Sequence, residues 1–279
     1  MKVALFIALA VFAGCFLAVW LRALHRRRSA PTAAGLGIGF ATNFFDTLGI
    51  GSFAPTAAIY RLTRMVPDER IPGTMNVGHT LPVVVMAYIY IALVDVDTTT
   101  LVTLIVAAIG GAWLGADLVS RLPQRPIQLG IGSALVVAAV LMTMAQLECM
   151  PLGGEARGLA TGPLVGAALA SVALGALNTI GVGFYGPCMI LIALLGMDPK
   201  AAFPIMMGAC AFLMPVGSAR FVQRDAYDAS AALGLTLGGI PAVLVAAFVV
   251  ESLPLDALRW LVVVVAVYTA ALMLRPARR

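Results

Sequence analysis

Charged residues are scarce in this chain. Asp, Glu, Lys and Arg make up 11% of its 279 residues, whereas hydrophobic residues make up 61%. A soluble domain of this length could not bury so much apolar surface. The composition excludes a soluble globular protein and predicts an all-α polytopic membrane protein, with the lipid bilayer as its solvent.

Residues that carry enzymatic or metal chemistry are also few. The sequence has two histidines, His25 and His79, and no HExxH motif or other group of nucleophile, base and metal ligands. Its four cysteines lack the CxxC spacing of metal and redox sites. We therefore expect no enzymatic activity, no metal, no cofactor and no disulfide.

Basic residues are present, but they form short clusters beside apolar runs. The chain has 18 Lys and Arg against 13 Asp and Glu. Clusters in such places orient a membrane protein, because Lys and Arg are retained in cytoplasmic loops. Nucleic acid is therefore not an expected partner.

Apolar runs long enough to cross a hydrocarbon core of about 30 Å recur along the chain. The first is expected to be a retained span rather than a cleaved signal peptide, because it leads into the basic sequence "HRRR" (His25–Arg28). Seven spans are expected, at Val3–Leu21, Thr74–Val94, Thr98–Val119, Ile127–Leu147, Ala201–Ala219, Ala229–Val250 and Leu255–Leu274.

Two further apolar stretches, Ala33–Tyr60 and Leu164–Leu195, are longer than one helix needs. Each contains a glycine-broken phrase, "TLGIGSFAP" (Thr47–Pro55) in the first and "TIGVGFYGP" (Thr179–Pro187) in the second. The phrases are 132 residues apart, counted from residue 47 to residue 179. Further pairs follow at the same offset: Pro67 and Pro199, Pro72 and Pro204, and Met75 and Met207.

Charge distribution indicates that both long stretches are re-entrant hairpins. If each enters the membrane and returns, 14 of the 18 Lys and Arg lie on one side and four on the other. Each repeat is then a broken helical hairpin plus three spans, so the second repeat has inverted topology. We expect the N terminus outside and the C terminus in the cytoplasm.

This organisation gives four segments. Residues 1–32 form an extra N-terminal helix and a basic cytoplasmic loop, 33–147 the first repeat, 148–163 an extracytoplasmic linker and 164–279 the second repeat. Inverted repeats with interrupted helices are typical of secondary transporters, whose site lies where the two breaks meet.

The breaks carry the candidate site. Glycines permit a turn there and leave backbone N–H groups at the start of a half-helix, where an anion can bind. Polar side chains at membrane depth mark a pathway or site. The expected substrate-binding residues are Asn43, Thr47, Gly49, Gly51, Asn76, His79, Asn178, Thr179, Gly181 and Gly183.

Asp46 has two interpretations that the sequence leaves open. It can cap the second half-helix of the first hairpin, or it can be the proton or cation site that couples transport. The roles of the residues around it are open in the same way. The glycines can serve only close helix packing, and Asn76 and His79 can be a polar pair satisfied between helices.

With Gly39 followed by "LGIG" (Leu48–Gly51) and "PGTMN" (Pro72–Asn76), and a counterpart in the second half, the chain resembles the TauE/SafE permeases, also described as sulfite exporters. The resemblance implies a bacterial inner-membrane permease that moves sulfite or a small organosulfonate such as sulfoacetate. The expected partners are this small anion, the bilayer and a coupling proton or cation, and a homodimer is also open. An anion channel with re-entrant half-helices is the second candidate function.

Overall fold

The computed structural model describes residues 2–27, 29–49, 51–119, 154–178 and 184–249, together with the single positions 136, 140, 143, 144, 147, 264 and 267. These residues are mostly helical and contain no strand, apart from one isolated bridge between Ala156 and Met197. The prediction of an all-α polytopic membrane protein is confirmed. The expected spans Ile127–Leu147 and Leu255–Leu274 lie almost wholly outside the described residues.

Several helices coincide with expected spans. Four have the length and apolar composition to cross a membrane: α1 (Lys2–Arg27), α4 (Ile71–Leu93), α9 (Ala202–Gln223, preceded by the 3-10 turn η2, Pro199–Ala201) and α10 (Ala229–Val249). The helix α5 (Thr98–Val119) begins at the residue expected from the sequence and continues to the last described residue of this segment. Asp97 immediately precedes it, and the Asp97 carboxylate accepts a hydrogen bond from the Thr100 backbone N–H at 2.8 Å.

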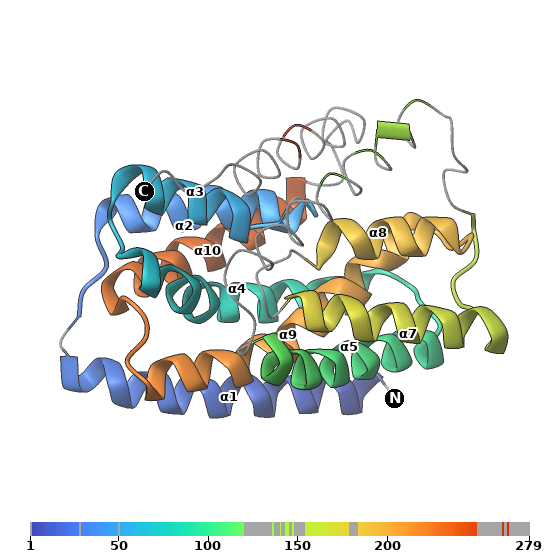
Figure 1. Cartoon of the computed structure of the whole chain (residues 1–279), viewed down its shortest axis with the longest axis horizontal. Coiled ribbons are helices and arrows are strands. Elements are labelled where there is room, and N and C mark those ends of the chain that lie inside the picture. Colours follow the sequence, from blue (N-terminus) through green and yellow to red (C-terminus); the bar gives the residue numbers. More distant parts are fainter. Residues whose placement is uncertain are drawn as a thin grey trace. The chain divides into compact units, whose positions relative to one another are not determined.

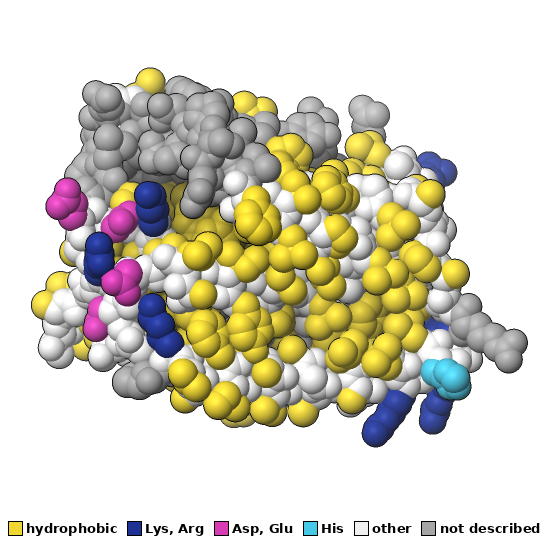
Figure 2. Space-filling model, turned by 180° about the vertical axis from the view of Figure 1, so that it is seen from behind, with side chains coloured by type: hydrophobic (Ala, Val, Ile, Leu, Met, Phe, Trp, Pro, Cys, Tyr) yellow, Lys and Arg dark blue, Asp and Glu magenta, His cyan; other side chains and the backbone are white. Residues whose placement is uncertain are grey.

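The outer surface is apolar. Large hydrophobic side chains such as Leu93, Trp113, Leu169 and Phe248 are more than two-thirds exposed. Figure 2 shows one face covered largely by hydrophobic side chains, with charged side chains at its margins. Such a surface is unfavourable in water and suits contact with lipid.

Contacts divide the chain into two compact units that interleave along the sequence. Unit 1 contains Met1–Leu93 and Cys210–Glu251, and unit 2 contains Val94–Ala209 and Ser252–Arg279. The boundary between Ala209 and Cys210 falls inside α9, so this helix contributes to both units.

In unit 1, the helices α2 (Ala33–Thr47) and α3 (Phe53–Thr63) form a hairpin whose second arm runs back beside the first. Ile38, early in α2, packs in one cluster with Tyr60, late in α3. A straight continuation of the chain would separate these two residues by about 33 Å at 1.5 Å per residue. Figure 1 shows the two arms lying side by side. The turn η1 (Asp68–Arg70) then leads into α4.

The first arm of this hairpin packs closely along α10, and glycines permit the approach. A Cβ atom on Gly39 would lie 2.6 Å from the Gly234 carbonyl oxygen. One on Gly238 would lie 2.1 Å from the carbonyl oxygen of Leu36. Since backbone atoms cannot move aside as a flexible side chain can, only glycine fits at these crossings.

Unit 2 has the same kind of packing. The helix α7 (Thr161–Asn178), which precedes α8 (Tyr185–Leu194), packs along α5. A Cβ atom on Gly111 of α5 would lie 1.9 Å from the Val172 carbonyl oxygen, and one on Gly175 would lie 2.0 Å from that of Ala108. The helices α2 and α7 occupy equivalent positions in the two halves of the sequence, and so do α5 and α10. Each hairpin arm therefore packs on a helix from the other half.

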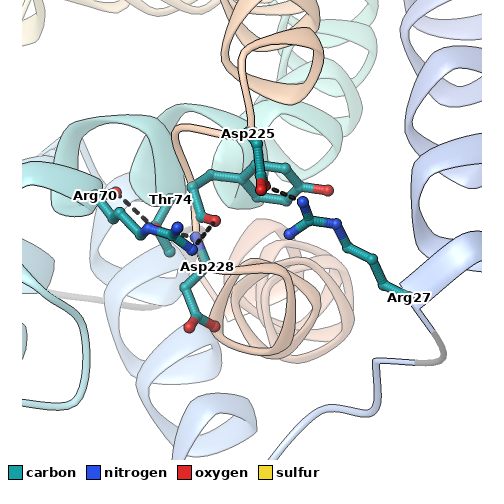
Figure 3. Close-up of polar contacts among 6 residues, drawn as sticks. Arg27, Arg70, Thr74, Asp225 and Asp228 are labelled. Carbon is teal, nitrogen blue, oxygen red and sulfur yellow. Dashed lines mark hydrogen bonds and ion pairs between the residues drawn. The ribbon is translucent and has the colours of Figure 1, made fainter.

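The loop between α9 and α10 is held to unit 1 by polar contacts (Figure 3). The Arg27 guanidinium donates to the Asp225 carboxylate and lies over the Tyr227 ring, 5.6 Å from its centroid. The Asp228 backbone N–H donates to Thr74 Oγ1 at 2.9 Å, and Asp228 Oδ1 accepts from the Ala231 N–H at the start of α10. These contacts join the ends of α1, α4 and α10. Burial raises the pKa of the Tyr227 phenol in this cluster.

Candidate functional site: the break in the first hairpin

The first repeated phrase interrupts the helix in unit 1. The helix α2 ends at Thr47, and α3 begins at Phe53. Gly49 and Gly51 have φ angles of 88° and 89°, in the left-handed region that favours glycine. Two backbone donors, Leu48 N–H and Gly49 N–H, close the last turn by bonding to Phe45 O and Asp46 O. Gly49 and Gly51 therefore allow the backbone to turn between the end of α2 and the start of α3.

The helix that leaves this break has no side-chain cap. Ser52 occupies the N-cap position of α3 without a capping hydrogen bond from its side chain. Pro55 follows in the first turn and carries no N–H. The first N–H groups of a helix have no partner within the helix, and the aligned peptide dipoles add partial positive charge there. An anion is the ligand that such an end favours.

Asp46 joins the two ends of the break. Its Oδ2 atom accepts a hydrogen bond from Ser52 Oγ at 2.9 Å, and the Ser52 backbone N–H also interacts with this carboxyl group. The side chain is buried, with 2% of its surface exposed. The N-cap position of α3 is thus occupied by Ser52, and its contact with Asp46 places an ionisable group at the start of α3.

His79 of α4 connects both arms of the hairpin. Its Nδ1 lies 3.0 Å from Asn43 Oδ1 on α2, and its Nε2 lies 3.1 Å from Thr56 Oγ1 on α3. The Asn43 amide nitrogen donates to Gly39 O at 2.8 Å and to Leu235 O at 3.4 Å, so its oxygen faces the histidine.

These partners define the hydrogen positions in the network. Asn43 Oδ1 can only accept, so Nδ1 of a neutral His79 carries the proton and Nε2 accepts from the Thr56 hydroxyl. All three side chains are fully buried. Both ring nitrogens of His79 are therefore occupied by the protein itself.

Two further contacts fix the end of α2. Thr47 Oγ1 donates to the Asn43 carbonyl oxygen at 2.7 Å, and the Tyr90 hydroxyl donates to the Thr47 carbonyl oxygen at 2.7 Å. Tyr90 lies eleven residues after His79 on α4, three helical turns along the same face.

The predicted site residues are distributed as follows. Asn43, Asp46, Thr47, Gly49, Gly51 and His79 lie at or beside this break. Asn76 lies apart from the network, because its side-chain amide donates to Pro72 O at 2.9 Å on a partly exposed face of α4. Asn178 is the last described residue of α7 and is partly buried. Thr179, Gly181 and Gly183 lie outside the described residues.

Sequence reasoning missed Thr56 and Tyr90. Thr56 had a usable signal, since it is a polar residue within an apolar stretch and lies one turn after Ser52. The sequence signal for Tyr90 was weaker and consisted of its three-turn spacing from His79.

The helix that follows the second repeated phrase begins in a similar way, in unit 2. The helix α8 begins at Tyr185 after the N-cap residue Phe184, again without a side-chain capping hydrogen bond. Its third residue is Pro187, as Pro55 is the third residue of α3. Polar groups are not repeated at equivalent positions: at the offset of 132, Gly175 replaces Asn43, Cys188 replaces Thr56 and Ala211 replaces His79.

Comparison with protein families gave one match. The model of the family described as sulfite exporter TauE/SafE matches residues 1–142, just over half of the 279 residues. Comparison with curated proteins gave no match.

Within the described residues, no group of three or more His, Cys, Asp or Glu could hold a metal ion.

Proposed function

Because this chain belongs to the sulfite exporter TauE/SafE family, we propose that it is a secondary transporter of a small anion. The proposed substrate is sulfite or a small organosulfonate such as sulfoacetate. We place it in the bacterial inner membrane, with the N terminus outside and the C terminus in the cytoplasm, and we propose that transport proceeds by alternating access.

The observation that carries this proposal is the uncapped start of α3 after a glycine break. The N–H groups of Phe53 and of the next residue have no carbonyl four residues earlier within the helix. They lie beside Asp46, Ser52 and Thr56 in the middle of an apolar chain. Oriented N–H donors at low dielectric can replace the hydration of a sulfonate or sulfite oxygen.

The sequence repeat explains why the chain has two uncapped helix starts. α8 begins in the same way, uncapped and with a proline at its third position. In an alternating-access transporter with inverted repeats, each repeat supplies one broken helix to the substrate. We therefore propose that backbone donors following both phrases bind the anion, with Asn178 and Thr179 as side-chain donors.

Asp46 is the proposed coupling group. An ionised carboxylate beside the start of α3 would repel an anion, whereas a protonated one would not. Binding of a proton and of the anion would then favour each other, which couples their movement. Asp46 is the acidic residue at the break, and its equivalent in the second half is Asn178.

The test is transport in proteoliposomes that contain the purified full-length protein. Sulfite, sulfoacetate, taurine and thiosulfate are compared with and without an imposed pH gradient. A transporter gives saturable flux and counterflow of labelled substrate, with flux of the true substrate driven by the gradient. Flux that neither saturates nor shows counterflow would identify an anion channel instead, and no flux of any of the four would contradict the substrate class.

A further inference from the structure

The cytoplasmic end proposed for α1 carries a wide, open groove whose lining residues all belong to this helix. The groove has a volume of about 640 Å³ and is lined by Leu21, Arg22, Leu24, His25 and Arg26. Arg22, His25 and Arg26 are exposed, and His25 and Arg26 follow Arg22 by three and four residues, so each lies near Arg22 on one side of the helix. Figure 2 shows basic side chains and a histidine projecting together beyond the hydrophobic surface.

The length of α1 places this groove at the level of lipid headgroups. The helix has 26 residues and is about 39 Å long at 1.5 Å per residue, whereas the hydrocarbon core is about 30 Å thick. A crossing that begins at Val3 therefore reaches the boundary of the core near Arg22. Arg26 lies one turn farther out, in the layer that contains the lipid phosphates.

The two arginines of the groove are available for a ligand. The neighbouring Arg27 already donates to Asp225 and lies over Tyr227. Among the described residues, Arg22 and Arg26 have no acidic partner. Two guanidinium groups one turn apart form a good site for the oxygens of a phosphate ester, because each can donate two parallel hydrogen bonds.

The same side of α1 offers a place for the rest of a lipid. Of the whole helix only Leu9, Phe16 and Trp20 are buried. Val11, Gly14, Cys15 and Ala18 lie below Arg22 on the same side and are exposed, and no atom lies within 4 Å of a Cβ built on Gly14. Small side chains leave room along the helix where an acyl chain can lie.

We propose that Arg22 and Arg26, with His25 beside them, bind the headgroup of an anionic glycerophospholipid whose acyl chain follows the exposed face of α1. This site is distinct from the break in the first hairpin and does not depend on the transport proposal. A zwitterionic lipid binds less well, because its ammonium group cancels the charge that the arginines select.

The test measures lipid binding to the purified protein by native mass spectrometry and by thermal stabilisation, with phosphatidylglycerol and phosphatidylcholine as probes. Each basic residue beside an anionic lipid contributes about fivefold to binding, so Arg22→Gln with Arg26→Gln should weaken phosphatidylglycerol binding roughly 25-fold. The matched control is Arg27→Gln, which should leave this binding unchanged because Arg27 is occupied by Asp225.

Two further measurements keep the test decisive. Inorganic phosphate and glycerol phosphate are added alone; if either stabilises the wild-type protein as much as the lipid does, the site binds a free phosphate group and the lipid proposal is wrong. If the double glutamine variant does not fold, Arg22→Lys with Arg26→Lys is used and should give a smaller loss. Equal binding of both lipids by the wild-type protein, or unchanged phosphatidylglycerol binding in the variants, overturns the proposal.

Discussion

His79 holds the two arms of the first hairpin in place. Asn43 occupies its Nδ1 atom, and Thr56 occupies its Nε2 atom. The histidine thus contacts one residue before the glycine break and one after it, while its own position is set by α4. Since neither nitrogen is free, His79 can influence an anion only through the geometry of the break, and its contacts indicate a positioning role.

We therefore predict that His79→Ala destabilises the protein by about 1–3 kcal/mol, because Asn43 Oδ1 and the Thr56 hydroxyl lose their partner in a buried site. Thermal unfolding of the purified protein measures the effect. The matched control is Asn76→Ala on the same helix, where the side chain bonds only to Pro72 O and is partly exposed. Equal changes in the two variants would show that the network contributes nothing specific.

Asp46→Asn tests the coupling role at the same break. The amide oxygen can still accept from Ser52 Oγ, whereas the group that binds a proton is removed. Substrate should still bind, and the pH dependence of transport should become flatter than in the wild-type protein. Initial rates in proteoliposomes between pH 5 and 8 provide the measurement. A profile that keeps its shape would leave Asp46 with a capping role alone.

At the scale of helices, the close approach of α5 and α7 should be sensitive to a single methyl group. Gly111→Ala places a Cβ atom 1.9 Å from the Val172 carbonyl oxygen, so the helices must separate, at a cost of about 1–3 kcal/mol. The adjacent Gly110→Ala meets nothing within 4 Å and should be neutral or stabilising, because alanine favours a helix over glycine. A lower melting temperature for Gly110→Ala than for Gly111→Ala would contradict this packing.

The sequence predicts helices better than it predicts their partners. Apolar length and the preceding polar residues are sufficient to place the start of α5 at Thr98. The pairing of α2 with α10 and of α5 with α7 joins residues far apart in the chain, and composition carries no signal for it. Glycines at the crossings are visible in the sequence, but nothing there shows which backbone each one meets.

The candidate site divides in the same way. Asn43, Asp46 and His79 are polar residues at membrane depth, which is a local signal that the sequence reveals. Asn76 shares the helix and the depth, yet its amide bonds to the carbonyl four residues earlier. A polar side chain can form its hydrogen bonds with its own helix or with a neighbouring helix. Tertiary packing decides between these two possibilities.

For the whole molecule, the positive-inside rule gives a testable orientation. Fusing a reporter that is active only in the cytoplasm to the C terminus should give high activity, and fusing it after residue 155 should give low activity. The opposite pattern would reverse the membrane orientation that we propose. High activity from both fusions would require a different number of crossings between these positions, so the hairpin topology would be wrong.

One helix belongs to both compact units. The boundary between them crosses α9 at Ala209 and Cys210 without interrupting the helix. Pro215 follows within two turns, and a proline removes the hydrogen bond to the carbonyl four residues earlier, that of Ala211. Residues 211–215 therefore lack one of the backbone hydrogen bonds that stiffen a regular helix, so α9 can bend more readily there.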